Sequence, residues 1–231
     1  MPFFDPMYFV FALPALVLMM YAQFKVRSAY GKYSEVRNMI GASGAQIARR
    51  LLDSAGLTDV PIEVVSGDLS DHYDPRGRVL RLSENVYYSP SVAAMGIAAH
   101  EVGHAVQDMQ SYVPMRVRAS LVPVVSLGSW LGYILFLMGF VVQLSGLVWV
   151  GIVLFSGAVL FALITLPVEY NASGRALQLL RANGVVSSVE LDGAKAVLGA
   201  AALTYVAALL QAVGQLLYWV LVAVGMGRRD D

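Results

Sequence analysis

The feature that most constrains this chain is a run of 50 residues without a charged side chain, from Ala119 to Val168. One crossing of a bilayer by an α-helix needs about 20 apolar residues. The run is therefore long enough for two helices, and the residues Gln143 to Gly146 suit a tight turn between them. A single soluble globule has no place for such a run except its core, so the sequence predicts a membrane protein.

Two further apolar runs lie near the ends of the chain. Met7 to Phe24 carries no charge, and Asp5 but no Lys or Arg precedes it. A signal peptide has a basic start, so we expect an uncleaved transmembrane helix here. Ala200 to Met226 is also uncharged. Only 14% of the residues are charged, against roughly 25% in ordinary soluble domains. The predicted fold is a mostly α membrane protein with about four transmembrane helices.

The apolar runs divide the chain into five predicted parts. These are a transmembrane helix (1–24), a small α+β domain (25–118), two transmembrane helices (119–168), a helical segment (169–198), and a fourth transmembrane helix with the tail (199–231). Eleven of the sixteen Lys and Arg lie in the second part and three in the fourth. The positive-inside rule places both parts in the cytoplasm. Arg228 and Arg229 then lie outside, which requires a tolerated short tail or an incomplete last crossing.

The 25–118 segment carries mixed helix and strand patterns. A helix is expected from Ser43 to Ala55, with Gly56 as its stop. Short strands are expected at 61–65 and 78–83, with a turn at 74–77 between them. The 78–83 strand alternates polar and apolar residues, so it is expected either to pair with an extended substrate or to face water as an edge. A last helix is expected from Pro90 to Gln107, capped by Ser89.

This last helix carries the strongest chemical signal, the sequence HEVGH. His100 and His104 are four residues apart, so both imidazoles project from one helix face and can share a metal ion. Glu101 is placed to act as general base on a metal-activated water without binding the ion. The chain has no cysteine and only three histidines, which excludes thiolate sites. The pattern predicts a Zn²⁺ peptidase.

A catalytic zinc usually has three protein ligands and a water. Two residues are candidates for the third ligand: His72, in the polar stretch Asp71 to Asp74, and Glu169, the carboxylate that ends the 50-residue run. His72 is also a candidate catalytic residue, as a hydrogen-bond donor to the oxyanion of the reaction. The polar stretch itself is equally consistent with a simple turn.

Several segments together resemble the YugP-type membrane zinc metallopeptidases of bacteria, and more distantly the HtpX-type enzymes. They are DHYDPRGRVLRLSENVY (71–87), AAHEVGHAVQ (98–107), LPVEYNASGRAL (166–177) and AALTYVAALL (201–210). The resemblance implies that Glu169 is the third ligand and that the protein is a multi-pass protein of the bacterial inner membrane. It also implies peptide or protein substrates, among them damaged membrane proteins. The chain departs from the usual form at Asn171, where Asp is common, and at Gly174, where Arg is common.

Asn171 and Arg175 are expected beside the ligands, because Asn171 can still accept a hydrogen bond and Arg175 follows Glu169 closely. The two departures leave open an alternative function, a weak or inactive metal-binding membrane scaffold. An intramembrane protease is disfavoured, because the apolar stretch before His100 is too short to cross. The neutral net charge gives no support for a nucleic-acid partner. The lipid bilayer is an expected partner, and an oligomer remains open.

Overall fold

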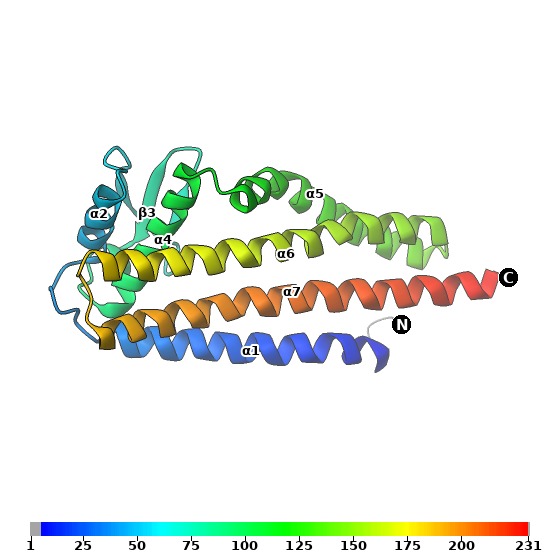
Figure 1. Cartoon of the computed structure of the whole chain (residues 1–231). Helices are drawn as coiled ribbons and strands as arrows, with labels where there is room; N and C mark the ends of the chain where they lie inside the picture. Colours follow the sequence, from blue (N-terminus) through cyan, green and yellow to red (C-terminus); the bar gives the residue numbers. More distant parts are fainter. Residues whose placement is uncertain (1–5, 231) are drawn as a thin grey trace. The chain divides into compact units, whose positions relative to one another are not determined.

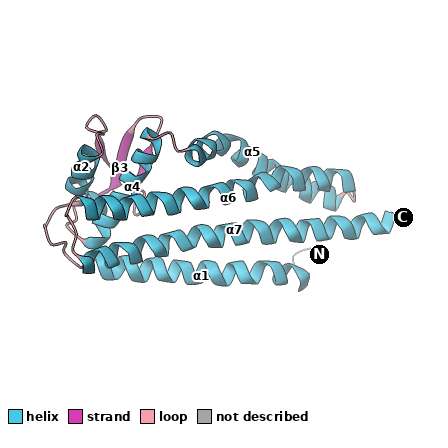
Figure 2. Cartoon of the chain, in the orientation of Figure 1, coloured by secondary structure: helices cyan, strands magenta, loops and turns pink. Residues whose placement is uncertain are grey.

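The computed structural model describes residues 6–230. The elements follow the order α1 (Pro6–Ser34), α2 (Gly44–Ser54), β1 (Ile62–Val65), β2 (His72–Asp74), β3 (Val79–Ser83), α3 (Glu84–Tyr87), α4 (Val92–Met109), α5 (Val113–Val141), α6 (Ser145–Ala182) and α7 (Ser188–Asp230) (Figure 1). Helix dominates the chain, and strands occur in one place only within the described residues (Figure 2).

Four helices are long and apolar enough to cross a membrane by length and composition, among the residues that the structure describes. They are α1, α5, α6 and the Ser188–Met226 part of α7. The predicted number of spans is confirmed at this level, and the turn predicted after the second span lies between Val141 and Ser145. The predicted divisions at residues 24, 168 and 198 do not coincide with helix ends. Hydropathy changes at these positions, but the residues on both sides favour helix, so α1, α6 and α7 run through them. The side chains of Arg228 and Arg229 lie outside the described residues.

The chain forms two compact units, and the first comprises residues 6–21, 116–166 and 204–230. Its core is aromatic: the rings of Phe136 and Trp219 stack with centroids 4.1 Å apart. Gly132 and Gly151 lie at a close contact of α5 with α6, where an added Cβ on Gly132 would come within 2.8 Å of the Gly151 carbonyl oxygen. Small residues at such contacts let transmembrane helices pack closely without a hydrophobic driving force.

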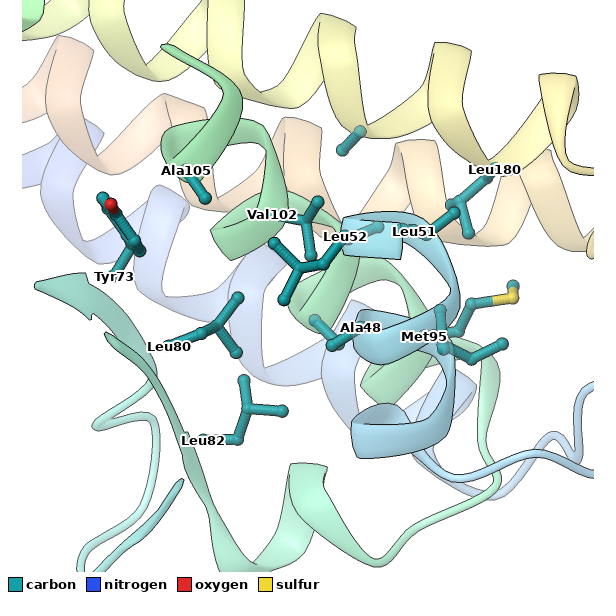
Figure 3. Packing of buried hydrophobic residues seen from close by; sticks show 14 of the residues in the cluster. Ala48, Leu51, Leu52, Tyr73, Leu80, Leu82, Met95, Val102, Ala105 and Leu180 are labelled. Atoms are coloured by element: carbon teal, nitrogen blue, oxygen red, sulfur yellow. The ribbon is translucent and has the colours of Figure 1, made fainter. Parts of the chain in front are cut away.

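The second unit comprises residues 22–115 and 167–203 and contains all the strands. Its sheet has the order β1-β3-β2, with β1 parallel and β2 antiparallel to β3. Apolar side chains of α2, α4 and the sheet form one buried core, to which α6 adds Leu180 (Figure 3). The core includes Leu51 and Leu52 of α2, Leu80 and Leu82 of β3, and Met95 and Val102 of α4.

The α2 helix was well predicted. Ser43 is its N-cap, and the side chains and backbones of Ser43 and Gln46 form a reciprocal capping box. Such a box satisfies two of the amide groups that a helix start leaves free. Gly56 follows the helix with a φ of +77°, a conformation that glycine adopts without steric penalty.

Three local predictions in the same unit were wrong. The 78–83 strand is not an edge, because β3 pairs on both sides, so no substrate strand can add to it. The polar stretch Asp71 to Asp74, for which a simple turn was one alternative, contributes the edge strand β2. The α4 helix begins after Ser91, whose side chain accepts a hydrogen bond from the Ala94 amide. Ser89 and Pro90 stay outside the helix, because their carbonyls accept hydrogen bonds from Gly44 and Asn38.

Candidate metal centre

The two histidines of HEVGH lie on α4, the helix most deeply buried in the second unit. Their ring centroids are 4.8 Å apart, as expected for residues one helical turn apart on one face. His104 is 8% exposed, and the side chain of His100 is 16% exposed. Both rings therefore lie largely out of bulk water.

Glu169 of α6 joins the pair from 69 residues away in the chain. Its Oε2 lies 3.2 Å from Nε2 of His100 and 3.5 Å from Nε2 of His104. Four-coordinate zinc with nitrogen and oxygen ligands near 2.0–2.1 Å keeps its donor atoms about 3.4 Å apart. One donor atom from each residue lies within 4.8 Å of the others. The three side chains fit a zinc ion with a fourth position left for water.

His72 is not brought into this group. Its side chain is exposed, and its Nδ1 lies 2.8 Å from the carbonyl oxygen of Ser70. Between the two candidates for the third ligand, the geometry therefore favours Glu169. The expected role of His72 as an oxyanion donor remains a prediction.

Polar residues behind His104 form a continuous set of hydrogen bonds. Nδ1 of His104 lies 2.9 Å from Oε1 of Gln107, and Nε2 of Gln107 donates to the backbone carbonyl of Val168 and to Oδ1 of Asn171. Nε of Arg175 donates to the same Asn171 oxygen at 2.7 Å. Asn171 thus reaches the ligand through Gln107, and Arg175 holds the Asn171 amide.

Two residues around the ligands were missed from the sequence. Gln107 is completely buried, and its position three residues after His104, on the same helix face, was the available signal. The hydroxyl of Ser173 lies 3.1 Å from Nδ1 of His100. Ser173 stands four residues after Glu169 on α6, so the same spacing argument applies to it. Each ligand histidine therefore has a polar side chain at the nitrogen that faces away from Glu169.

Glu101 is held by the edge strand of the sheet. Its carboxylate accepts a hydrogen bond of 2.9 Å from the backbone N–H of Tyr73 in β2, and Glu101 is 7% exposed. The Tyr73 hydroxyl donates to Asp108, seven residues further along α4. Burial, together with the bond to Asp108, raises the pKa of this phenol. The strand is thus attached to α4 at two points, and Glu101 is oriented by one of them.

Charge in this region is concentrated and poorly solvated. Burial by itself lowers the pKa of His104, but the bond to Glu169 and the negative charges of Glu101 and Glu169 outweigh it and raise the value overall. Burial raises the pKa of Asp71, against the opposing effect of the hydrogen bonds from Ser83, and the charge of Glu101 adds to the increase. The negative charges of Glu101 and Glu169 thus act on His104, and negative charge close to the two imidazoles favours a cation there.

Gly103 lets α4 and α6 approach each other at this centre. An added Cβ on Gly103 would lie 2.5 Å from the carbonyl oxygen of Ala172. Ala172 stands between Glu169 and Ser173 on α6, so the backbone contact sets the distance between the helices that carry the ligands.

Comparison with known proteins finds a zinc-peptidase family and a membrane-protease relative. The family described as "Putative neutral zinc metallopeptidase" matches residues 8–224. The chain is 50% identical over 226 residues to the protein named "Putative membrane protease YugP" of Bacillus subtilis (strain 168), a match that covers 97% of this chain and 100% of that relative. No solved structure matches the chain.

Proposed function

Because the chain belongs to the neutral zinc metallopeptidase family, we propose that it is a membrane-embedded zinc endopeptidase whose metal is held by His100, His104 and Glu169. The observation that carries this proposal is the meeting of these three side chains from two helices, with donor atoms within 4.8 Å of one another. Zinc is the family's cofactor, and lipid and a peptide or protein substrate are the partners that a membrane peptidase requires.

The proposed chemistry is hydrolysis of a peptide bond. Zinc, when bound, activates a water molecule and polarises the scissile carbonyl. Glu101 accepts the proton that the attacking water releases and delivers it to the departing amine nitrogen, while the carbon–nitrogen bond breaks. The Tyr73 amide orients the Glu101 carboxylate for this transfer. Gln107 and Ser173 hold the two imidazoles from behind, as outer partners of metal-binding histidines commonly do.

Two substitutions test the assignment of base and ligand. Glu101→Gln should retain one zinc per chain and lose cleavage of an unfolded protein substrate such as casein, because only the base is removed. Glu169→Ala should lose both zinc and cleavage, because it removes a ligand. Metal analysis and cleavage assays on detergent-purified protein separate these outcomes. A wild-type protein that binds zinc without turnover would instead favour the inactive scaffold.

His72 is proposed to assist the reaction as an oxyanion donor. It lies on β2 next to Tyr73, whose amide holds Glu101. His72→Ala should lower mainly kcat, while zinc content stays near one per chain. A loss of zinc would assign His72 to the metal, and unchanged kinetics would remove it from the mechanism.

We place the catalytic unit on the cytoplasmic side of the bacterial inner membrane. The distribution of Lys and Arg supports the cytoplasmic side. The position of Glu169 directly after the apolar run on α6 supports a site close to a membrane face. The chain has no native cysteine, so single-cysteine variants report cleanly on sidedness. A membrane-impermeant maleimide applied to intact cells should label Gln143→Cys, in the turn before α6, but not Thr58→Cys. The reverse pattern would reverse the orientation.

Damaged or misfolded membrane proteins are the proposed substrates, on the resemblance to HtpX-type enzymes. Proteomic comparison of cells that express wild type or Glu101→Gln tests this. Membrane proteins should accumulate in association with the inactive variant, and enrichment of soluble proteins alone would contradict the proposed substrate class.

A further inference from the structure

The side chain of Gln107 bonds to residues of both helices that carry the proposed ligands. It is completely buried, and each of its polar atoms has a partner. Oε1 faces Nδ1 of His104 on its own helix, and Nε2 bonds to Val168 and Asn171 on α6. A buried amide with all its polar atoms bonded adopts a single orientation, because any other leaves polar atoms unpaired.

The orientation of this amide follows from its neighbours. The backbone carbonyl of Val168 only accepts hydrogen bonds, so the Gln107 atom that faces it at 2.9 Å must be the NH₂ group. Oδ1 of Asn171 is likewise fixed as an acceptor, because the guanidinium of Arg175 donates to it and cannot accept. Both hydrogens of the Gln107 NH₂ group are therefore used, and Oε1 is the atom left for His104.

Since Oε1 can only accept, Nδ1 of His104 must carry a hydrogen and donate it. We propose that Gln107 is a positioning residue that holds His104 with its hydrogen on Nδ1, so that the lone pair of Nε2 is directed to the metal. The hydrogen bond also opposes rotation of the ring, which would exchange the two nitrogens. Arg175 and Asn171 act behind Gln107 by preventing the amide from flipping.

The same side chain also links the two helices next to two of the proposed ligands. Val168 precedes Glu169 directly on α6, so the bond from Gln107 to the Val168 carbonyl ties the helix of His104 to the turn that carries the third ligand. This inference rests on the proposed metal centre but adds a separate determinant of its affinity. Removal of an outer partner of a metal-binding histidine typically lowers metal affinity by about 10–100-fold.

Three variants test the role of Gln107 in detergent-purified protein. Gln107→Met keeps approximately the length of the side chain and removes all its hydrogen bonds. Gln107→Glu keeps an acceptor for His104 and loses the donors to Val168 and Asn171. Gln178→Met is the matched control, because Gln178 is an exposed glutamine of α6, nine residues after Glu169.

Two measurements are needed. Zinc affinity is measured by competition with a chelator, and the nitrogen that carries the hydrogen in His104 is identified by ¹⁵N NMR of metal-free protein at a pH where the imidazole is neutral. Wild type and Gln178→Met should show hydrogen on Nδ1 of His104 and similar zinc affinity. Gln107→Met should bind zinc about 10–100-fold more weakly. Its His104 should no longer show a spectrum in which the hydrogen is held on Nδ1 alone. Gln107→Glu should retain that signal and still bind zinc more weakly.

Hydrogen on Nε2 of His104 in the wild type would overturn the inference, as would unchanged zinc affinity in Gln107→Met. If Gln107→Met does not fold, Gln107→Glu decides: retention of the Nδ1–H signal supports the inference and its loss overturns it. A wild type that binds no zinc would sink the metal centre itself. The NMR result, obtained without metal, would then still be interpretable on its own.

Discussion

Gly103→Ala is the substitution whose effect can be worked out most directly from the structure. The added Cβ would lie 2.5 Å from the carbonyl oxygen of Ala172, whereas carbon–oxygen contacts in helix interfaces lie near 3.3–3.6 Å. The helices α4 and α6 must therefore separate by about 0.8 Å, because the obstructing atom is backbone and cannot rotate away. Metal–ligand distances tolerate only about 0.2 Å. We expect zinc affinity to fall by at least about 10-fold, and overpacking to reduce the free energy of unfolding by about 1–3 kcal/mol.

The control for this substitution is Gly174→Ala. Gly174 is exposed on α6, five residues after Glu169, and an added Cβ there meets nothing within 4 Å. Alanine should stabilise the helix by up to about 1 kcal/mol and leave zinc affinity unchanged. Chelator competition and thermal unfolding of both variants in the same detergent provide the comparison. Wild-type zinc affinity together with wild-type thermal stability in Gly103→Ala would refute the reasoning, because it would mean that α4 and α6 separate at no cost.

Three further predictions concern the metal, the sheet and pH. Removing zinc with a chelator should lower the thermal unfolding midpoint, and restoring free zinc to about 100 times Kd should add about 2.7 kcal/mol to the free energy of unfolding; an unchanged midpoint would contradict a structural contribution of the ion. Tyr73→Phe should destabilise the protein by about 1.5–3 kcal/mol while retaining zinc, because it leaves the partly buried Asp108 carboxylate without its hydroxyl donor; equal denaturation curves would argue against that bond. The pKa of Asp71 is raised from 3.8 in the folded protein, so the folded state binds the extra proton and wild-type stability should fall as pH rises through the interval above 3.8. Thermal unfolding midpoints of metal-free wild type and Asp71→Asn are compared from about pH 4 to 7. As the pH rises, the wild-type midpoint should fall relative to that of the variant, and midpoints that change in parallel would exclude the effect.

Local sequence patterns were sufficient for the membrane helices and for the principal motif. Hydropathy over about 20 residues is a property of contiguous sequence, so the runs around Ala119–Val168 identified their helices without tertiary information. The four-residue spacing of His100 and His104 has one geometric meaning on a helix. The capping of α2 by Ser43 is likewise settled within one turn. In each case the residues that decide the structure are close together in the chain.

The third ligand and the residues around it depended on the fold. From the residues alone His72 and Glu169 were both candidates, and the resemblance to HtpX-type enzymes pointed to Glu169. The meeting of Glu169 with the two histidines depends on which part of the chain packs on α4. Two other contacts join segments 28 or more residues apart: the bond of the Tyr73 amide to Glu101 and the bond of Gln107 to Val168. The pairing of β3 on both sides depends on the order of strands in the sheet. Such contacts depend on how buried surfaces fit together over the whole unit. The local sequence around HEVGH therefore determined that a metal could be bound, and the resemblance suggested the third ligand. Only the tertiary structure decided which side chains stand behind the ligands, because those contacts join distant parts of the chain.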